Sequence, residues 1–229
     1  MSTEIPISIE DLNKIEVSWD HHYAEIFREL DIAPIRRYAE SFEQLLLEQS
    51  QTIRKDLKKK IDKMTYDEQC DWYGEIDEIE YTFTKILRYS LFVHSYSLFE
   101  TRLLRIADDY RRIHKLPEYP ASSKDTGITR AQKCLKNFAS VQFPEGSAWQ
   151  DILVFRLIRN QIVHNDGNLP QGHSKKRRED RRIIEKFIKR NNNISFDLSE
   201  SFELSKQFIV HVIATFNKFL DELCANLKM

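Results

Sequence analysis

The sequence predicts an all-helical fold. Glycine and proline are scarce in this 229-residue chain, with 5 and 6 residues, so it lacks the turn residues that a many-stranded sheet needs. Apolar side chains recur instead at spacings of three to five residues over long stretches, which is typical of helices with one buried face. Hydrophobic residues make up 41% and charged residues 31%, enough for a core and a solvated surface. We expect a bundle of long antiparallel helices.

The first half of the chain is expected to form two long helices. Residues 1–18 have mixed character and are interpreted as an N-terminal extension. Residues 19–64 carry an apolar stripe that predicts helix, and Pro34 is expected either to kink it or to divide it in two. A second long helix is expected over about residues 66–116, with Gly74 as the point where it could be interrupted.

The second half is expected to hold shorter elements. A short helix is predicted over residues 128–140, and a longer one over about 149–165. The strongly basic segment 171–190 is interpreted as a loop that leads into a short helix, and residues 193–204 as a short extended or hairpin piece. An amphipathic helix over about residues 203–228 closes the chain.

Residues 19–229 are expected to form a single helical domain, because no internal repeat and no second core can be discerned. The net charge is −1, so any binding of nucleic acid must depend on a local basic patch. The first residues lack a basic stretch followed by an apolar one, and no window approaches the length of a membrane span. We therefore expect a cytoplasmic protein without membrane contact.

The segment DILVFRLIRNQIVHNDG, residues 151–167, carries the candidate chemistry. Arg156, Asn160 and His164 step by four and would line one polar stripe of a helix. Arg159 lies about 140° from His164 around the axis, at 3.6 residues per turn, and long side chains could still converge on a ligand or across a dimer. The expected apolar anchor of the helix consists of Ile152, Leu153, Leu157, Ile158 and Ile162.

An Arg, a directly following Asn and a His five positions after the Arg (RNQIVH) resemble the signature of the HEPN family, the higher eukaryotes and prokaryotes nucleotide-binding superfamily. The preceding HSYSLFETRLLRI, RAQKCLKNF and FPEGSAWQDI segments follow the order of its abortive-infection and toxin-like branch. The resemblance implies a HEPN-like helical bundle. It also implies a metal-independent ribonuclease without cofactor that acts as a homodimer, in a toxin or antiviral defence role.

Each residue of the motif suits such a reaction. Cleavage by a ribose 2′-hydroxyl needs proton transfer and stabilisation of a more negative phosphorane. His164 is assigned acid or base duty, since imidazole titrates near neutral pH, and Arg159 is assigned the phosphate clamp. Asn160 would orient the phosphate or the histidine. Arg156 and Glu100 are expected to support the site, Glu100 through an ion pair with Arg159. No metal site is expected.

The basic segment that follows the motif is a second candidate. Residues 171–190 hold nine Lys and Arg against three acids, so an RNA backbone that enters the site could be held there. Mobile solvated surface is the competing interpretation. The residues expected to bind RNA are Lys175, Lys176, Arg177, Arg178, Arg181 and Arg182.

Two alternatives to a ribonuclease remain open. The chain could be a non-catalytic HEPN module that binds a partner protein or a nucleotide. It could also be a structural scaffold, in which Arg159 and His164 would face solvent singly without a shared cleft. Expected partners are an RNA substrate, a second copy of the chain, and an antitoxin or another protein of a defence system. His94 and His211 lie in apolar helical stretches and are interpreted as core histidines.

Overall fold

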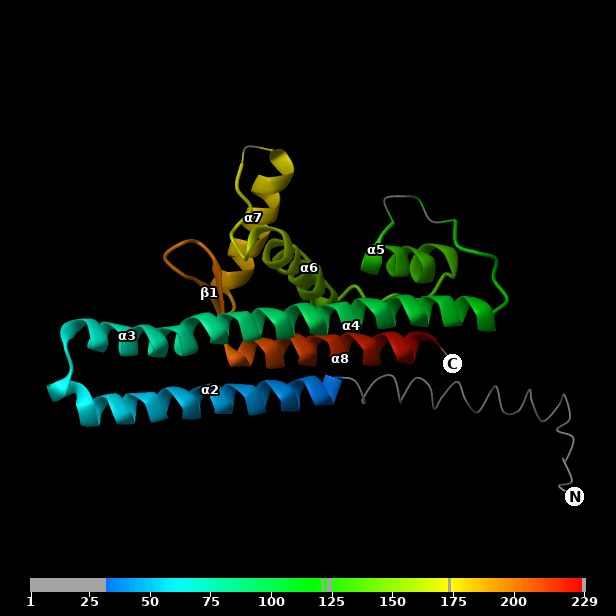
Figure 1. Ribbon diagram of the computed structural model, residues 1–229. Helices are drawn as coiled ribbons and strands as arrows, with labels where there is room; N and C mark the ends of the chain where they lie inside the picture. The colour runs from blue at the N-terminus through cyan, green and yellow to red at the C-terminus, as the bar shows by residue number, and fades with distance from the viewer. Residues whose placement is uncertain (1–31, 121, 123–124, 173, 228–229) are drawn as a thin grey trace, which may run out of the picture. The chain divides into compact units, whose positions relative to one another are not determined.

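The computed structural model describes residues 32–120, 122, 125–172 and 174–227. Over these residues the fold is helical, apart from one two-stranded hairpin (Figure 1). The predicted all-α class with a short hairpin near residues 193–204 is thereby confirmed. The predicted extension over residues 1–18 lies outside the described residues. In the part of the chain that the structure describes, every helix is too short or too polar to cross a bilayer.

The first half of the chain forms long helices, as predicted, but its interruptions differ. Gly74 lies inside a helix, and the break comes a few residues later in a π-helical segment. Pro34 lies two residues after the described start of its helix, and the part of the predicted helix before Ile32 lies outside the described residues. The elements are α2 (Ile32–Lys60), η1 (Ile61–Lys63), α3 (Tyr66–Asp77), the π-helical η2 (Glu78–Phe83) and α4 (Thr84–Ile113).

Local capping explains why α3 begins at Tyr66. The hydroxyl of Thr65 accepts a hydrogen bond from the backbone N–H of Glu68 at 3.3 Å. The carboxylate of Glu68 accepts one in return from the backbone N–H of Thr65 at 2.7 Å. This reciprocal pair satisfies two donors that a helix start otherwise leaves open.

The second half departs from the predictions at two places. The basic segment forms a full helix directly after its Ser174 cap, rather than a loop and a short helix. The last helix begins at Lys206, because Glu203 is part of a strand, opposite Ser195. The elements are α5 (Gly127–Gln132), the π-helical η3 (Lys133–Phe138), α6 (Ser147–Asn165), α7 (Lys175–Lys189), β1 (Ile194–Phe196), β2 (Phe202–Leu204) and α8 (Lys206–Leu227).

The chain divides into two compact units. Among the described residues, the first comprises 32–33, 100–120, 122, 125–144 and 217–227, and it contains α5 and η3. The second comprises Pro34–Phe99 and Glu145–Phe216, and contains α6, α7 and the hairpin. The single domain over residues 19–229 stays a prediction.

The core of the second unit is aromatic and centres on Phe155 of α6. Its ring makes edge contacts with Phe92 at 6.3 Å, Phe187 at 5.8 Å and Phe208 at 5.9 Å between centroids. Phe92, Phe155 and Phe208 are each 0% exposed. Since these rings come from α4, α6, α7 and α8, the motif helix is fixed from several sides.

In the first unit, polar contacts around Asp125 close the loop before α5. The buried carboxylate of Asp125 pairs with Lys133 and accepts hydrogen bonds from the Tyr119 hydroxyl and the Ser122 backbone N–H, both at 3.1 Å. These bonds tie the loop before α5 to η3. The same hydrogen bonds lower the pKa of Asp125 to about 2, and the one from Lys133 is the largest cause.

Candidate active site

Helix α6 carries the motif and is anchored by its apolar residues. Of the predicted anchors, Ile152 and Ile158 are 0% exposed, whereas the others are half-buried. Phe155, which sequence reasoning did not include, is also 0% exposed, and its ring contacts five others. The buried residues of α6 are Ala148, Trp149, Ile152, Val154, Phe155 and Ile158.

Arg159 is half-buried and oriented by its neighbour. It lies four residues after Phe155 and seven after Ile152, so its stem continues the buried face of the helix. Its Nη1 donates a hydrogen bond to Oδ1 of Asn160 at 3.1 Å. Its Nε is buried and has no hydrogen-bond partner among the described residues. A buried donor without a partner is costly, and an acceptor from a ligand would satisfy it.

His164 lies in the last turn of α6 and is exposed to solvent. The helix continues through Asn165 without a break, so the separation of about 140° between Arg159 and His164 around the axis is kept. Asn160 and Arg156 are half-buried on the same stripe. The structure thus brings Arg159 and Asn160 into contact, while the exposed His164 lies at the helix end.

The backbone turns sharply after the motif. Asp166 adopts a left-handed conformation with φ 51°, and Gly167 follows with φ 78°. The N–H of Gly167 donates to the carbonyl of Gln161 at 3.1 Å, which closes the helix end. Gly167 thus lies in the left-handed region beside Asp166, whereas Asn165 remains helical.

The hairpin and α4 fix this turn, a feature that sequence reasoning missed. The N–H of Phe202 donates to the carbonyl of Gly167 at 3.0 Å, and the Tyr89 hydroxyl donates to the carbonyl of Phe202 at 2.6 Å. The hydroxyl of Ser201 donates to Oδ1 of Asn168 at 2.9 Å. Gly167 ends the segment singled out in the sequence, but nothing in the sequence indicated that Tyr89 lies beside it.

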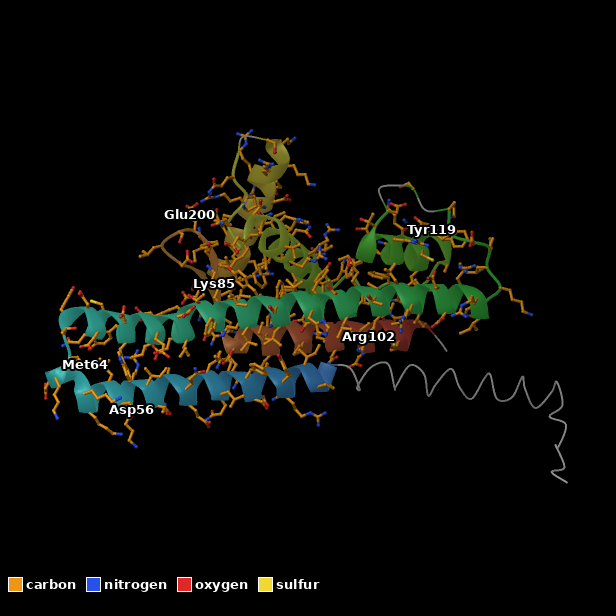
Figure 2. The ribbon with its side chains drawn as sticks, in the orientation of Figure 1. Asp56, Met64, Lys85, Arg102, Tyr119 and Glu200 are labelled. Atoms are coloured by element: carbon orange, nitrogen blue, oxygen red, sulfur yellow. The ribbon has the colours of Figure 1, made fainter. Side chains whose placement is uncertain are left out.

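Tyr89 is buried and lies near charged side chains. Burial raises the pKa of this phenol, and the carboxylates of Asp197 and Asp166 raise it further. Lys85 pairs with Asp197 at 3.2 Å, and its ammonium lies 5.6 Å from the centroid of the Tyr89 ring. Figure 2 labels Lys85 on α4 and Glu200 in the turn of the hairpin. The end of the motif helix is therefore held by a hydrogen-bonded and ion-paired frame.

Arg156 and Glu100, the two residues predicted to support the site, belong to different units. Arg156 lies half-buried on α6. Glu100 belongs to the first unit, where its carboxylate lies so close to Gly127 that a Cβ there would overlap it. Gly127 has φ 54°, a conformation that glycine adopts without strain. The ion pair between Glu100 and Arg159 stays a prediction.

The basic residues all lie on or beside α7, but only some are available. Arg181 donates to Glu185 at 2.8 Å and to Glu200 at 3.1 Å, and these hydrogen bonds raise its pKa. The Nη1 of Arg177 donates to the carbonyl of Gln171 at 3.0 Å. The other four predicted RNA-binding residues, Lys175, Lys176, Arg178 and Arg182, are exposed.

An apolar groove of about 780 Å³ lies between α2 and α4 and contains none of the motif residues. His94 is exposed at this groove, so its interpretation as a core histidine is wrong. His211 is half-buried, with its ring 6.0 Å from that of Phe155. The groove is lined by Pro34, Ile35, Tyr38, Phe42, Leu46, Phe83, Ile86, Leu87, Ser90, Leu91 and His94.

Within the described ranges, no group of three or more His, Cys, Asp and Glu side chains is arranged to hold a metal ion. Comparison of the chain with protein-family models, curated proteins and solved structures found no match.

Proposed function

We propose that this protein is a metal-independent endoribonuclease of the HEPN type, which cleaves RNA through attack of a ribose 2′-hydroxyl. The observation that carries the proposal is the state of Arg159. Its guanidinium is held by Asn160 at 3.1 Å, and its buried Nε lacks a hydrogen-bond partner among the described residues. A phosphate oxygen is an acceptor that suits such a guanidinium.

The reaction needs two proton transfers and one stabilised charge. The 2′-oxygen forms a bond to phosphorus while the bond from phosphorus to the 5′-oxygen breaks, which leaves a 2′,3′-cyclic phosphate and a 5′-hydroxyl. The 2′-hydroxyl proton passes to a base, and the 5′-oxygen receives a proton from an acid. Exposed His164 can reach solvent and substrate for either transfer. Arg159 offsets the additional negative charge on the phosphorane.

The helix geometry favours a composite site. Arg159 and His164 of one helix point about 140° apart, so a single copy presents them in different directions. In a symmetric homodimer, Arg159 of one copy and His164 of the other could face one phosphate. The single His164 of each site could then take the proton of the 2′-hydroxyl and return it to the 5′-oxygen. The resemblance to HEPN toxins supports this arrangement, and with it a role as toxin or phage-defence effector that has an antitoxin or defence-system partner.

The proposal is tested by incubating purified protein with total RNA in EDTA. His164→Ala and Arg159→Ala are compared with His94→Ala and Arg37→Ala, which remove the same side chains from exposed positions outside α6. We expect cleavage with cyclic phosphate ends by wild type and both controls, and none by the two α6 variants. Cleavage that persists in the α6 variants would contradict the assignment. No cleavage by any protein would favour the non-catalytic binding module.

A mixing experiment tests the composite site. Inactive His164→Ala and inactive Arg159→Ala proteins are denatured together, refolded and assayed. If each site takes Arg159 from one copy and His164 from the other, the mixed dimers regain one intact site and hence part of the wild-type rate. Failure to regain any activity, in mixtures shown to contain mixed dimers, would contradict the composite site but not the assignment of the two residues.

A further inference from the structure

Helix α7 has two faces of opposite character. Ile184 and Phe187 are 0% and 2% exposed and hold the helix against the core of the second unit. On the other side, cationic residues recur at spacings of three, four, four and three. At about 100° per residue, this spacing keeps them within a strip about 80° wide that runs along the helix. This cationic stripe consists of Lys175, Arg178, Arg182, Lys186 and Lys189, all of them exposed.

The cations of the stripe are available for a ligand, unlike three neighbouring arginines. Arg181 is engaged with Glu185 and Glu200, Arg177 with the carbonyl of Gln171, and Arg190 with Asp151. In the stripe, the one ion pair with a described residue joins Arg182 to Glu179 at 3.9 Å, between side chains that are 79% and 58% exposed. Pairs this exposed contribute little. The arginines with closer acid partners, Arg181 and Arg190, thus lie outside the stripe.

The stripe fits a linear polyanion. It extends over about 21 Å at 1.5 Å per residue, and it contains no aromatic side chain to stack on bases. A helix that lies on a lipid surface needs a free apolar face, whereas the apolar residues of α7 are buried in its own unit. The ammonium groups of its three lysines contact phosphate as point charges and do not read base sequence. A phosphodiester backbone is therefore the favoured ligand.

The stripe belongs to the same unit as the motif. The ring of Phe187 on α7 contacts that of Phe155 on α6 at 5.8 Å, and Arg190 pairs with Asp151 of α6. In Figure 1, α7 follows α6 in the chain and leads into the hairpin. We propose that the stripe of α7 holds the phosphate backbone of RNA independently of sequence and presents it to α6. The proposal rests on the ribonuclease function for the identity of its ligand.

Binding is measured by fluorescence anisotropy, with labelled single-stranded DNA and RNA of one sequence over a range of KCl concentrations. DNA lacks the 2′-hydroxyl, so its binding is read without cleavage. The stripe variant carries Lys175→Gln, Lys186→Gln and Lys189→Gln. The control carries Lys55→Gln, Lys58→Gln and Lys63→Gln, the same change of charge at exposed positions outside α7. Thermal unfolding checks that both variants are folded.

We expect DNA and RNA to bind wild type within a few-fold of each other. The slope of log K against log salt should fall in magnitude by about 2 in the stripe variant, since each phosphate contact with a single strand contributes about 0.7. The control should keep the wild-type slope. Equal losses in both variants, or binding without salt dependence, would overturn the proposal. So would loss of binding to vesicles of anionic phospholipid in a stripe variant whose nucleic-acid binding is unchanged.

The outcome is separable from that of the ribonuclease proposal. If His164→Ala binds like wild type and no protein cleaves RNA, the stripe stands as a nucleic-acid surface and the catalytic assignment fails. If wild type cleaves RNA but the stripe variant binds and cleaves like the control, the stripe proposal alone fails.

Discussion

Tyr89 lies against Gly167, two residues after the end of the motif helix. A Cβ at position 167 would come within 2.7 Å of Cζ of the Tyr89 ring, and nearer still to its hydroxyl oxygen. The chain can make this approach only because residue 167 lacks a side chain and accepts φ 78°. The position of His164, three residues earlier, therefore depends on a glycine that carries no chemistry.

Gly167→Ala is expected to lower the free energy of unfolding by about 1–3 kcal/mol, because it adds both strain at a left-handed residue and overlap with a buried ring. Urea unfolding measures the change. Gly74→Ala is the matched control, since it lies inside α3 with nothing within 4 Å of an added Cβ. There the same substitution should stabilise by about 0.5–1 kcal/mol. Equal effects at the two positions would contradict the description of the turn.

Tyr89→Phe removes the donor that serves the carbonyl of Phe202. At neutral pH we expect a loss of about 1–2 kcal/mol, because a buried acceptor is left unsatisfied. Burial raises the pKa of Tyr89 in the folded state, so its contribution is present below the unfolded pKa of about 10 and is lost as pH rises above it. Wild type should lose more stability than Tyr89→Phe between about pH 9 and 11. Parallel losses would show that the phenol is not buried.

The two main residues of the motif should differ in their effect on stability. His164 is exposed, so His164→Ala should change the free energy of unfolding by less than about 0.5 kcal/mol. Arg159 packs its stem along the buried face, so Arg159→Ala should cost about 1 kcal/mol. Thermal and urea unfolding of both variants test this difference. If Arg159→Ala costs nothing, its unpartnered Nε must offset the packing of its stem.

Asp125 should contribute to acid sensitivity. Its folded pKa of about 2, held down first by Lys133 and then by the Ser122 N–H, lies below the unfolded value of about 3.9. Its stabilising effect is therefore complete above about pH 4 and is lost as pH falls towards about 2. Asp125→Asn should unfold at a lower temperature than wild type near neutral pH, and the difference should vanish at low pH. Asp62→Asn, at an exposed position of η1, is the control for charge.

Much of the fold could be predicted because a helix with one buried face has apolar residues at a regular spacing in its sequence. Long helical stretches around α2, α4 and α8 follow from that period and from the scarcity of glycine. The short hairpin lies where residues 193–204 were expected to form a short extended or hairpin piece. Helix α7 was underestimated, because its first half has no apolar stripe. Its strong helix formers and the Ser174 cap, which accepts from the N–H of Arg177 at 3.2 Å, extend it back to Lys175.

The residues of the candidate site could be predicted from the sequence, but their contacts could not. Spacing alone puts Arg159 and His164 on different sides of α6, and the regular helix keeps them there. The contact between Arg159 and Asn160 depends on rotamers, and the frame of Tyr89 and Phe202 joins residues 113 positions apart. Such long-range pairs leave no periodic signal in a sequence. The start of α8 was misjudged for a related reason, since Glu203 is committed to its strand partner Ser195.

The π-helical segment η2 sets the helical phase between α3 and α4. A π-helical turn accommodates one residue more than a regular α-helical turn, so deletion of a single residue within Glu78–Phe83 could restore an unbroken α-helix. Such a deletion would rotate α4 by about 100° relative to α3. Phe83, Ile86 and Leu87 would then turn away from the α2 side chains with which they now line the groove. The apolar lining of the groove thus depends on the one additional residue in η2, and deletion of a single residue there would be enough to remove it.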